Sequence, residues 1–148
     1  MDKALMFPLA LVPILAHAVL APGQPAATRA ALDARYVHMQ APERVAADEV
    51  FLVKITMKNT GTATWGEGFS LFSQEPDGKA TWGTNYIILG QGRRIAPGQE
   101  VTFSSYLRAP SAPGRYAFQW RAGNRRGQFG QPTEKKTILV TARPPGPG

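Results

Sequence analysis

The stretch from Lys54 to Trp65, KITMKNTGTATW, decides how the rest of this chain is interpreted. Its first residues end an alternating apolar run, and Asn59-Thr60-Gly61 follows as a turn. Asn and Gly tolerate positive φ, and an Asn side chain can bond the backbone two residues further on. We therefore expect a strand end, a tight corner and a tryptophan that packs back onto the core as a lid.

The residues before this corner form the clearest predicted strand, at 48–58. One face of the strand is wholly apolar and carries Phe51, Val53, Ile55 and Met57. The intervening positions are mostly polar. A strict period of two over this length indicates a half-buried strand and not an amphipathic helix.

Turns rich in Gly and Pro divide the rest of the chain into short segments, since 148 residues include 15 Gly and 13 Pro. We expect further strands at 35–40, 69–74, 101–108, 115–121 and 137–141, and a less regular one at 82–89. About seven short strands without a convincing helix predict an all-β fold, an immunoglobulin-like antiparallel β-sandwich.

The core of this sandwich must hold without a covalent link. The chain has no cysteine, which excludes a disulfide and a thiolate metal site. Its centre is expected to consist of Phe51, Val53, Ile55, Phe103, Leu107, Phe118 and Trp120.

The two ends of the chain differ from this middle part. Residues 1–21 combine Lys3, a short apolar run and Ala16-His17-Ala18, which predicts a secretory signal peptide cleaved near Ala18. A retained membrane anchor is the alternative. We expect a flexible spacer at 22–34, the sandwich domain at 35–141 and a Pro/Gly-rich tail at 142–148. This layout predicts an extracytoplasmic protein in the periplasm, on the cell surface or secreted.

Several marks along the predicted domain resemble one known family. Asn59, Gly61 and Trp65 have the N-x-G-x-x-x-W spacing of the four-tryptophan immunoglobulin-like domain. That domain is the central one of the selective-autophagy cargo receptor named after the neighbour of a breast-cancer gene, and it also occurs in bacterial proteins. Later marks of the same family stand at Pro97-Gly98, Pro110, Pro113-Gly114, Tyr116, Trp120 and Phe129-Gly130.

The resemblance covers about residues 35–141 and implies a binding module that is not an enzyme, here as an exported copy of the bacterial type. Two departures from the family pattern stand out. Ile55 occupies the place where the family often has its first tryptophan, and the final strand has no tryptophan. The corner is therefore expected to be packed differently, with Trp65 as its lid.

No set of residues in the sequence predicts catalysis. Beyond the predicted signal peptide the only histidine is His38, and a metal site or a base–nucleophile pair needs more partners. We therefore expect no enzyme activity, no cofactor and no metal. A hydrolase would require carboxylates that gather around His38 in the folded chain.

The candidate binding surface consists of Trp82 and Tyr86, because Trp82 stands beside a glycine with nothing nearby that requires its burial. Three basic pairs are the other candidates, in a chain with a formal net charge of +7. They are Arg93-Arg94, Arg125-Arg126 and Lys135-Lys136.

Two kinds of partner follow from these residues. The first is a protein partner, or further copies of this chain, bound through Trp82 and Tyr86. The alternative is an anionic glycan or envelope polymer bound through the basic pairs. We expect no nucleic-acid partner, and contact with a membrane only if the N-terminal segment is retained.

Overall fold

The computed structural model of the chain describes residues 30–75 and 80–146. These ranges contain ten β-strands and no helix. The strands are β1 (Ala34–Gln40), β2 (Arg44–Ala46), β3 (Val50–Asn59), β4 (Ser70–Ser73), β5 (Tyr86–Ile88), β6 (Glu100–Arg108), β7 (Gly114–Phe118), β8 (Trp120–Asn124), β9 (Gly127–Gln128) and β10 (Lys136–Thr141). No helix in the described part could cross a membrane.

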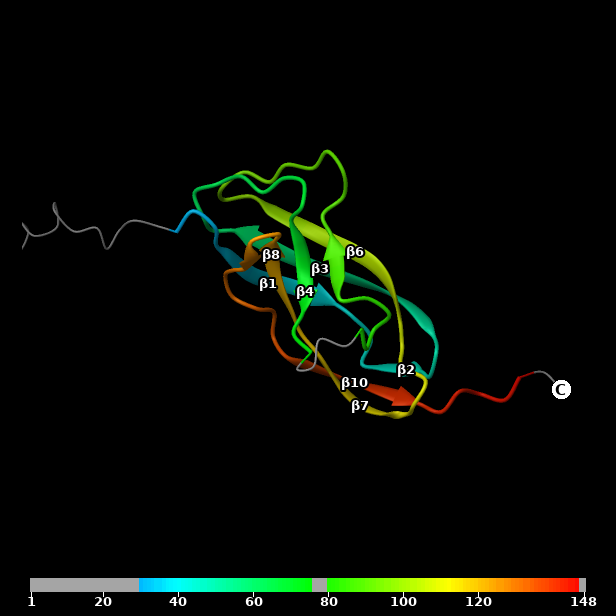
Figure 1. Cartoon of the computed structure of the whole chain (residues 1–148). Helices are drawn as coiled ribbons and strands as arrows, with labels where there is room; N and C mark the ends of the chain where they lie inside the picture. The colour runs from blue at the N-terminus through cyan, green and yellow to red at the C-terminus, as the bar shows by residue number, and fades with distance from the viewer. Residues whose placement is uncertain (1–29, 76–79, 147–148) are drawn as a thin grey trace, which may run out of the picture.

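The strands form two layers. One layer is the sheet β1–β3–β6. The other combines β5–β4–β8–β9 with β2–β10–β7, because only Gln119 separates β7 from β8. Figure 1 shows β4 and β8 crossing in front of the first sheet. All strand pairs are antiparallel except β2 with β10, which is parallel. The all-β immunoglobulin-like sandwich is confirmed, with one parallel pair that the sequence did not indicate.

The core lies between these layers and contains the residues that the alternation in the sequence predicts. On β3, the side chains of Val53, Ile55 and Met57 are fully buried, while the intervening residues face outward. All seven side chains that we expected at the centre are buried. Burial of each large apolar side chain stabilises the fold by about 1.5–3 kcal/mol, which explains how the sandwich holds without a disulfide.

The buried side chain of Asn59 is the hub of the corner after β3. Its amide nitrogen donates to the carbonyls of Ala63 (2.8 Å) and Ile95 (2.9 Å), and its oxygen accepts from the Gly61 N–H (3.0 Å). Its own backbone carbonyl accepts from the Gly98 N–H at 2.7 Å. The Asn59 amide therefore ties the corner to the loop before β6.

Gly61 is required because the chain passes close to it. A Cβ atom at position 61 would collide with the carbonyl oxygen of Ala31. Residues 30–33 are held there by hydrogen bonds, including Ala63 N–H to Ala31 C=O (3.0 Å) and the Thr60 hydroxyl to the Asp33 carboxylate (3.0 Å). The expected spacer at 22–34 is thus too long, because residues 30–33 belong to the domain and β1 begins at Ala34.

Trp65 closes the corner as the lid that the sequence predicts. Its backbone pairs with Ile95 in both directions, at 2.9 Å each, and its side chain is fully buried. The indole ring stacks on Phe69, with 6.0 Å between ring centroids, and meets Phe129 edge-on. Next to Phe129, a Cβ atom at Gly130 would lie 2.5 Å from the backbone nitrogen of Ala34, so glycine lets this segment approach β1.

Tyr116 adds a feature that is typical of immunoglobulin-like folds. Its hydroxyl donates to the carbonyl of Ala112, four residues upstream, at 2.6 Å. A tyrosine near the start of the corresponding strand makes this bond in many such sandwiches. In this chain it ties the start of β7 to the proline-rich turn before it.

We predict that Asn59→Asp strongly destabilises the fold, although the two side chains have nearly the same shape. The new carboxylate oxygen would face the carbonyls of Ala63 and Ile95, which would lose their donor inside the core. We expect a loss of about 3 kcal/mol or more in the free energy of unfolding, measured by chemical denaturation.

Asn124→Asp is the matched control for this substitution. The Asn124 side chain acts through its oxygen, which accepts from the Arg126 N–H at 2.8 Å, and aspartate keeps that acceptor. Its unfolding free energy should change by less than about 0.5 kcal/mol. Equal losses in both variants would show that Asn59 has no special role.

Candidate functional site

Trp82 does not lie on a binding surface, which corrects the sequence-based interpretation. Its side chain is only 1% exposed. The ring packs edge-on against Phe51, Tyr116 and Phe118, with centroid distances of 5.8, 6.0 and 5.4 Å. The indole N–H donates to the carbonyl of Ala117 at 3.3 Å. Trp82 is therefore a core residue that joins both layers, and it leaves Tyr86 without its expected companion.

Tyr86 is exposed, as expected, and it lies among apolar side chains that the sequence did not single out. Tyr86 and Ile88, on β5, are 52% and 62% exposed. Phe72 of β4 lies directly opposite Tyr86 and is half-buried. We call these three side chains, Phe72, Tyr86 and Ile88, the β5 face.

A glycine explains how Phe72 can lie flat on the sheet. A Cβ atom at Gly123 would be only 2.8 Å from the Phe72 ring, so the ring lies over the bare backbone of β8. The β5 face is thus a low apolar surface at the sheet's edge, and a partner could approach it without displacing a bulky side chain.

The arginine pairs Arg93-Arg94 and Arg125-Arg126 lie on either side of one turn, at one end of this sheet. Arg125 lines a cavity of about 260 Å³ together with Glu67, Ile88 and Gln91. Across the turn at 66–68, the Arg94 guanidinium lies 3.8 Å from the position that a Cβ atom on Gly66 would take. We call these four arginines the arginine rim. Glu67 is the carboxylate among them, so the rim keeps an excess of positive charge.

The third basic pair lies elsewhere. Lys136 is on β10 and lines a separate cavity of about 420 Å³ with Arg44, Arg115 and Glu43. Arg44 and Arg115 both lie opposite Leu139, on the two neighbouring strands. The sequence therefore predicts the basic residues, but only the strand order shows that they form two clusters.

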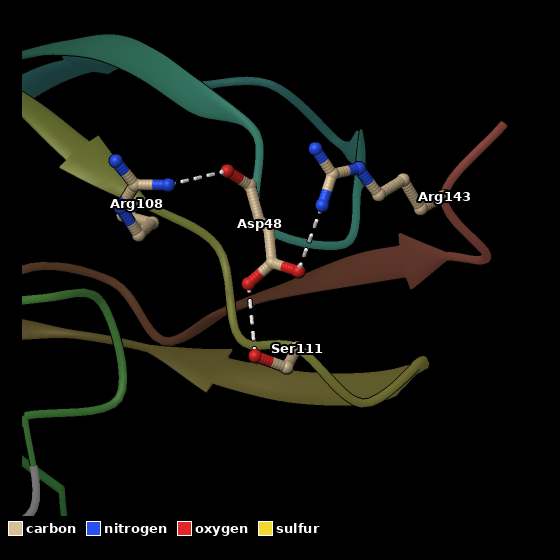
Figure 2. A network of polar contacts seen from close by, with 4 residues as sticks. All are labelled: Asp48, Arg108, Ser111 and Arg143. Carbon is tan, nitrogen blue, oxygen red and sulfur yellow. Dashed lines mark hydrogen bonds and ion pairs between the residues drawn. The ribbon is translucent and has the colours of Figure 1, made fainter. Parts of the chain in front are cut away.

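A polar network around Asp48 brings a serine hydroxyl to a carboxylate (Figure 2). The Ser111 hydroxyl donates to the Asp48 carboxylate at 2.8 Å, and the Arg108 guanidinium donates to the Asp48 backbone carbonyl at 3.0 Å. Arg143, in the tail after β10, lies 3.8 Å from the same carboxylate. Asp48 has a φ of 64°, so these contacts hold a strained turn between β2 and β3.

His38 cannot join this network to form a catalytic group. It lies on β1 opposite Thr56 of β3, whereas Asp48 precedes the start of β3 at Val50. The six residue steps of extended strand from Val50 to Thr56 span about 20 Å. Within the ranges 30–75 and 80–146, no group of three or more His, Cys, Asp or Glu side chains could hold a metal ion.

The phenol of Tyr36 is a weaker acid than that of an ordinary tyrosine. Burial, together with its hydrogen bond to the Glu134 carboxylate (3.1 Å) and the charge of that group, raises the pKa of Tyr36 to about 12. Each of these effects disfavours the phenolate. The pair links β1 to the segment before β10, and it serves the fold.

Comparison with protein families identifies the domain. The family model described as "Ig-like domain from next to BRCA1 gene" matches residues 38–134. The chain belongs to this family. Membership indicates a non-catalytic module for protein–protein interaction. Asn59, Gly61 and Trp65 form its corner, as the preceding contacts show.

Other comparisons add little about the function of this family member. No curated protein matches the chain. Similar solved structures include two variants of a superoxide reductase (neelaredoxin) from Ignicoccus hospitalis. They are 17% and 19% identical, cover 82% and 76% of this chain and 89% and 82% of their own, and have TM-scores of 0.31 and 0.27. Likeness at this level carries no argument about activity.

Replacement of Trp82 should cost stability, whereas replacement of Tyr86 should not. We predict that Trp82→Ala lowers the free energy of unfolding by about 3–5 kcal/mol, because it empties a site between three aromatic rings. Tyr86→Ala should change it by less than about 1 kcal/mol, since its side chain is largely in solvent. Chemical denaturation compares the two, and a larger loss for Tyr86→Ala would contradict this assignment.

The raised pKa of Tyr36 predicts a change of stability at alkaline pH. A folded pKa of about 12, against an unfolded value near 10, means that the contribution is fully present below pH 10. It is lost as the pH rises from about 10 to about 12. The unfolding free energy of Tyr36→Phe should fall less over this interval than that of the natural protein, whereas Tyr106→Phe, at an exposed position, should behave like the natural protein. Identical curves for all three would refute the assignment.

Proposed function

We propose that this chain is an exported, non-catalytic immunoglobulin-like module that recognises a protein partner outside the cytoplasm. The single observation that carries the proposal is the β5 face, an exposed apolar surface at a sheet edge in a domain of an interaction family. Exposed aromatic and apolar side chains that lie together are typical of recognition surfaces. The signal-peptide pattern at residues 1–21 supports export.

Self-assembly is the less favoured form of this proposal. Each of two copies that met through the β5 face would carry an arginine rim and a formal net charge of +7. Like charges at close range oppose such a contact. A different protein with acidic side chains near its contact residues fits the surface better.

Binding of an anionic glycan or envelope polymer is the second candidate. Arg44, Arg115 and Lys136 around one cavity favour it, together with the arginine rim. Phe69 lines the hollow beside Arg125, but one face of its ring already stacks on Trp65. A polymer bound by charge alone would be released steeply as salt increases.

Capture of partners from an envelope extract tests the proposal. The full chain should be expressed, recovered from the exported fraction and immobilised, and N-terminal sequencing should show a start near residue 19. We expect specific proteins to be retained, and Tyr86→Ala/Ile88→Ala to retain at least tenfold less of them, because truncation of residues at the centre of an interface often costs more than about 1.4 kcal/mol.

Tyr106→Ala is the matched control, since Tyr106 is 72% exposed on the opposite sheet and should retain every partner. The second candidate would be favoured if polysaccharide is retained, if this retention falls steeply with salt, and if substitutions in the β5 face do not change it. A chain found in the cytoplasm with its N-terminal residues intact would contradict export.

A further inference from the structure

The hydrogen-bond register of β5 directs the backbone N–H and C=O groups of two of its residues away from β4. Ser73 N–H donates to Asn85 C=O (2.8 Å), and Leu89 N–H donates to Phe69 C=O (3.1 Å). In an antiparallel pair, hydrogen-bonded and non-hydrogen-bonded positions alternate. Ile87, opposite Leu71, is therefore a bonded position. Tyr86 and Ile88 are not, and their backbone N–H and C=O groups point away from β4.

Thr84 satisfies the outward backbone groups of Tyr86. Its hydroxyl accepts from the Tyr86 N–H at 3.3 Å and donates to the Tyr86 carbonyl at 3.1 Å. The described part of the chain provides no such partner for the N–H and C=O of Ile88. Ile88 thus presents one backbone donor and one backbone acceptor at an exposed edge. The corresponding groups of Tyr86 are covered by the Thr84 hydroxyl alone.

Two other sheet edges in the described chain are interrupted. The edge of β1 has an irregular register between Tyr36 and His38, and its first residue, Ala34, accepts a hydrogen bond from Gln131 at 2.8 Å. The end of β6 is covered by the loop before β5, because Arg108 N–H donates to Trp82 C=O at 3.0 Å. Natural proteins commonly guard sheet edges in this way, and β5 is guarded only at Tyr86.

We propose that β5 receives an extended segment of the partner protein as an added strand, with apolar residues against the β5 face and acidic residues against the arginine rim. This inference rests on the proposed function. Backbone hydrogen bonds to Ile88 would supply affinity, and side chains at alternate positions would supply specificity. The arginine rim, opposed by Glu67, selects an acidic segment over a second copy of this basic chain.

The test uses the full chain and a defined probe, the acetylated and amidated heptapeptide Val-Thr-Val-Thr-Glu-Thr-Glu, whose valines and glutamates share one face of an extended strand. Titration followed by NMR should shift the amides of Tyr86 and Ile88 and slow hydrogen exchange at Ile88. The same peptide with Lys in place of each Glu should bind more weakly. Shifts confined to the cluster of Arg44, Arg115 and Lys136, or no shifts at all, would overturn the proposal.

Three substitutions test the hydrogen bonds themselves. Ile88→Pro removes an N–H that β4 does not use, so the edge should still form. It should weaken binding about three- to tenfold relative to Ile88→Ala, which keeps that N–H. Thr84→Val frees the backbone groups of Tyr86 and should tighten binding by a similar factor. Equal affinities of the Pro and Ala variants would overturn the added strand.

N-methylation of the probe keeps the test valid even if Ile88→Pro fails to fold. An added strand uses the amides of alternate residues only, so one of two alternating N-methylated sets should lose binding and the other should keep it. Loss in both sets, or in neither, would contradict the proposal. If defined peptides fail while capture of partner proteins still depends on Tyr86, the added strand falls and the proposed function stands.

Discussion

The fold depends on one buried amide. Asn59 is fully buried at the end of β3, and its side chain makes three hydrogen bonds, to the backbone of Gly61, Ala63 and Ile95. A buried polar group that is satisfied in this way fixes geometry, because any displacement leaves donors or acceptors without partners. This amide holds the corner against the loop that leads into β6, and the backbone of the corner in turn bonds the segment at 30–33. Trp65 can then seal the end of the core.

The sequence was informative wherever local chemistry sets the structure. The alternation in β3 predicted its buried face, and Asn59, Gly61 and Trp65 predicted the corner and its lid. The start of the domain and the shortest strands were harder to predict from the sequence. Residues 30–33 contain no strand pattern, and they join the domain because the bare backbone of Gly61 gives them a place to lie. β2 and β9 have three and two residues, too few to show a period.

The binding surface was harder to predict because it depends on contacts distant in the sequence. Trp82 stands next to a glycine, as an exposed residue would, but Phe51, Tyr116 and Phe118 enclose it from other strands. Phe72 and Ile88 acquire their importance only when β4 pairs with β5. The position of each arginine pair likewise follows from the order of the strands. A rigid corner and an exposed edge thus divide the domain into a part that maintains the fold and a part available to partners.

Native-state hydrogen exchange of individual amides tests this division most directly. The amides of Gly61, Trp65, Ile95 and Gly98, which donate within the corner, should exchange only through global unfolding, with the full unfolding free energy. The Ile88 amide, turned to solvent at the edge, should exchange orders of magnitude faster in the same sample. Rapid exchange of the corner amides by local opening, or protection of Ile88 in the isolated protein, would contradict the account.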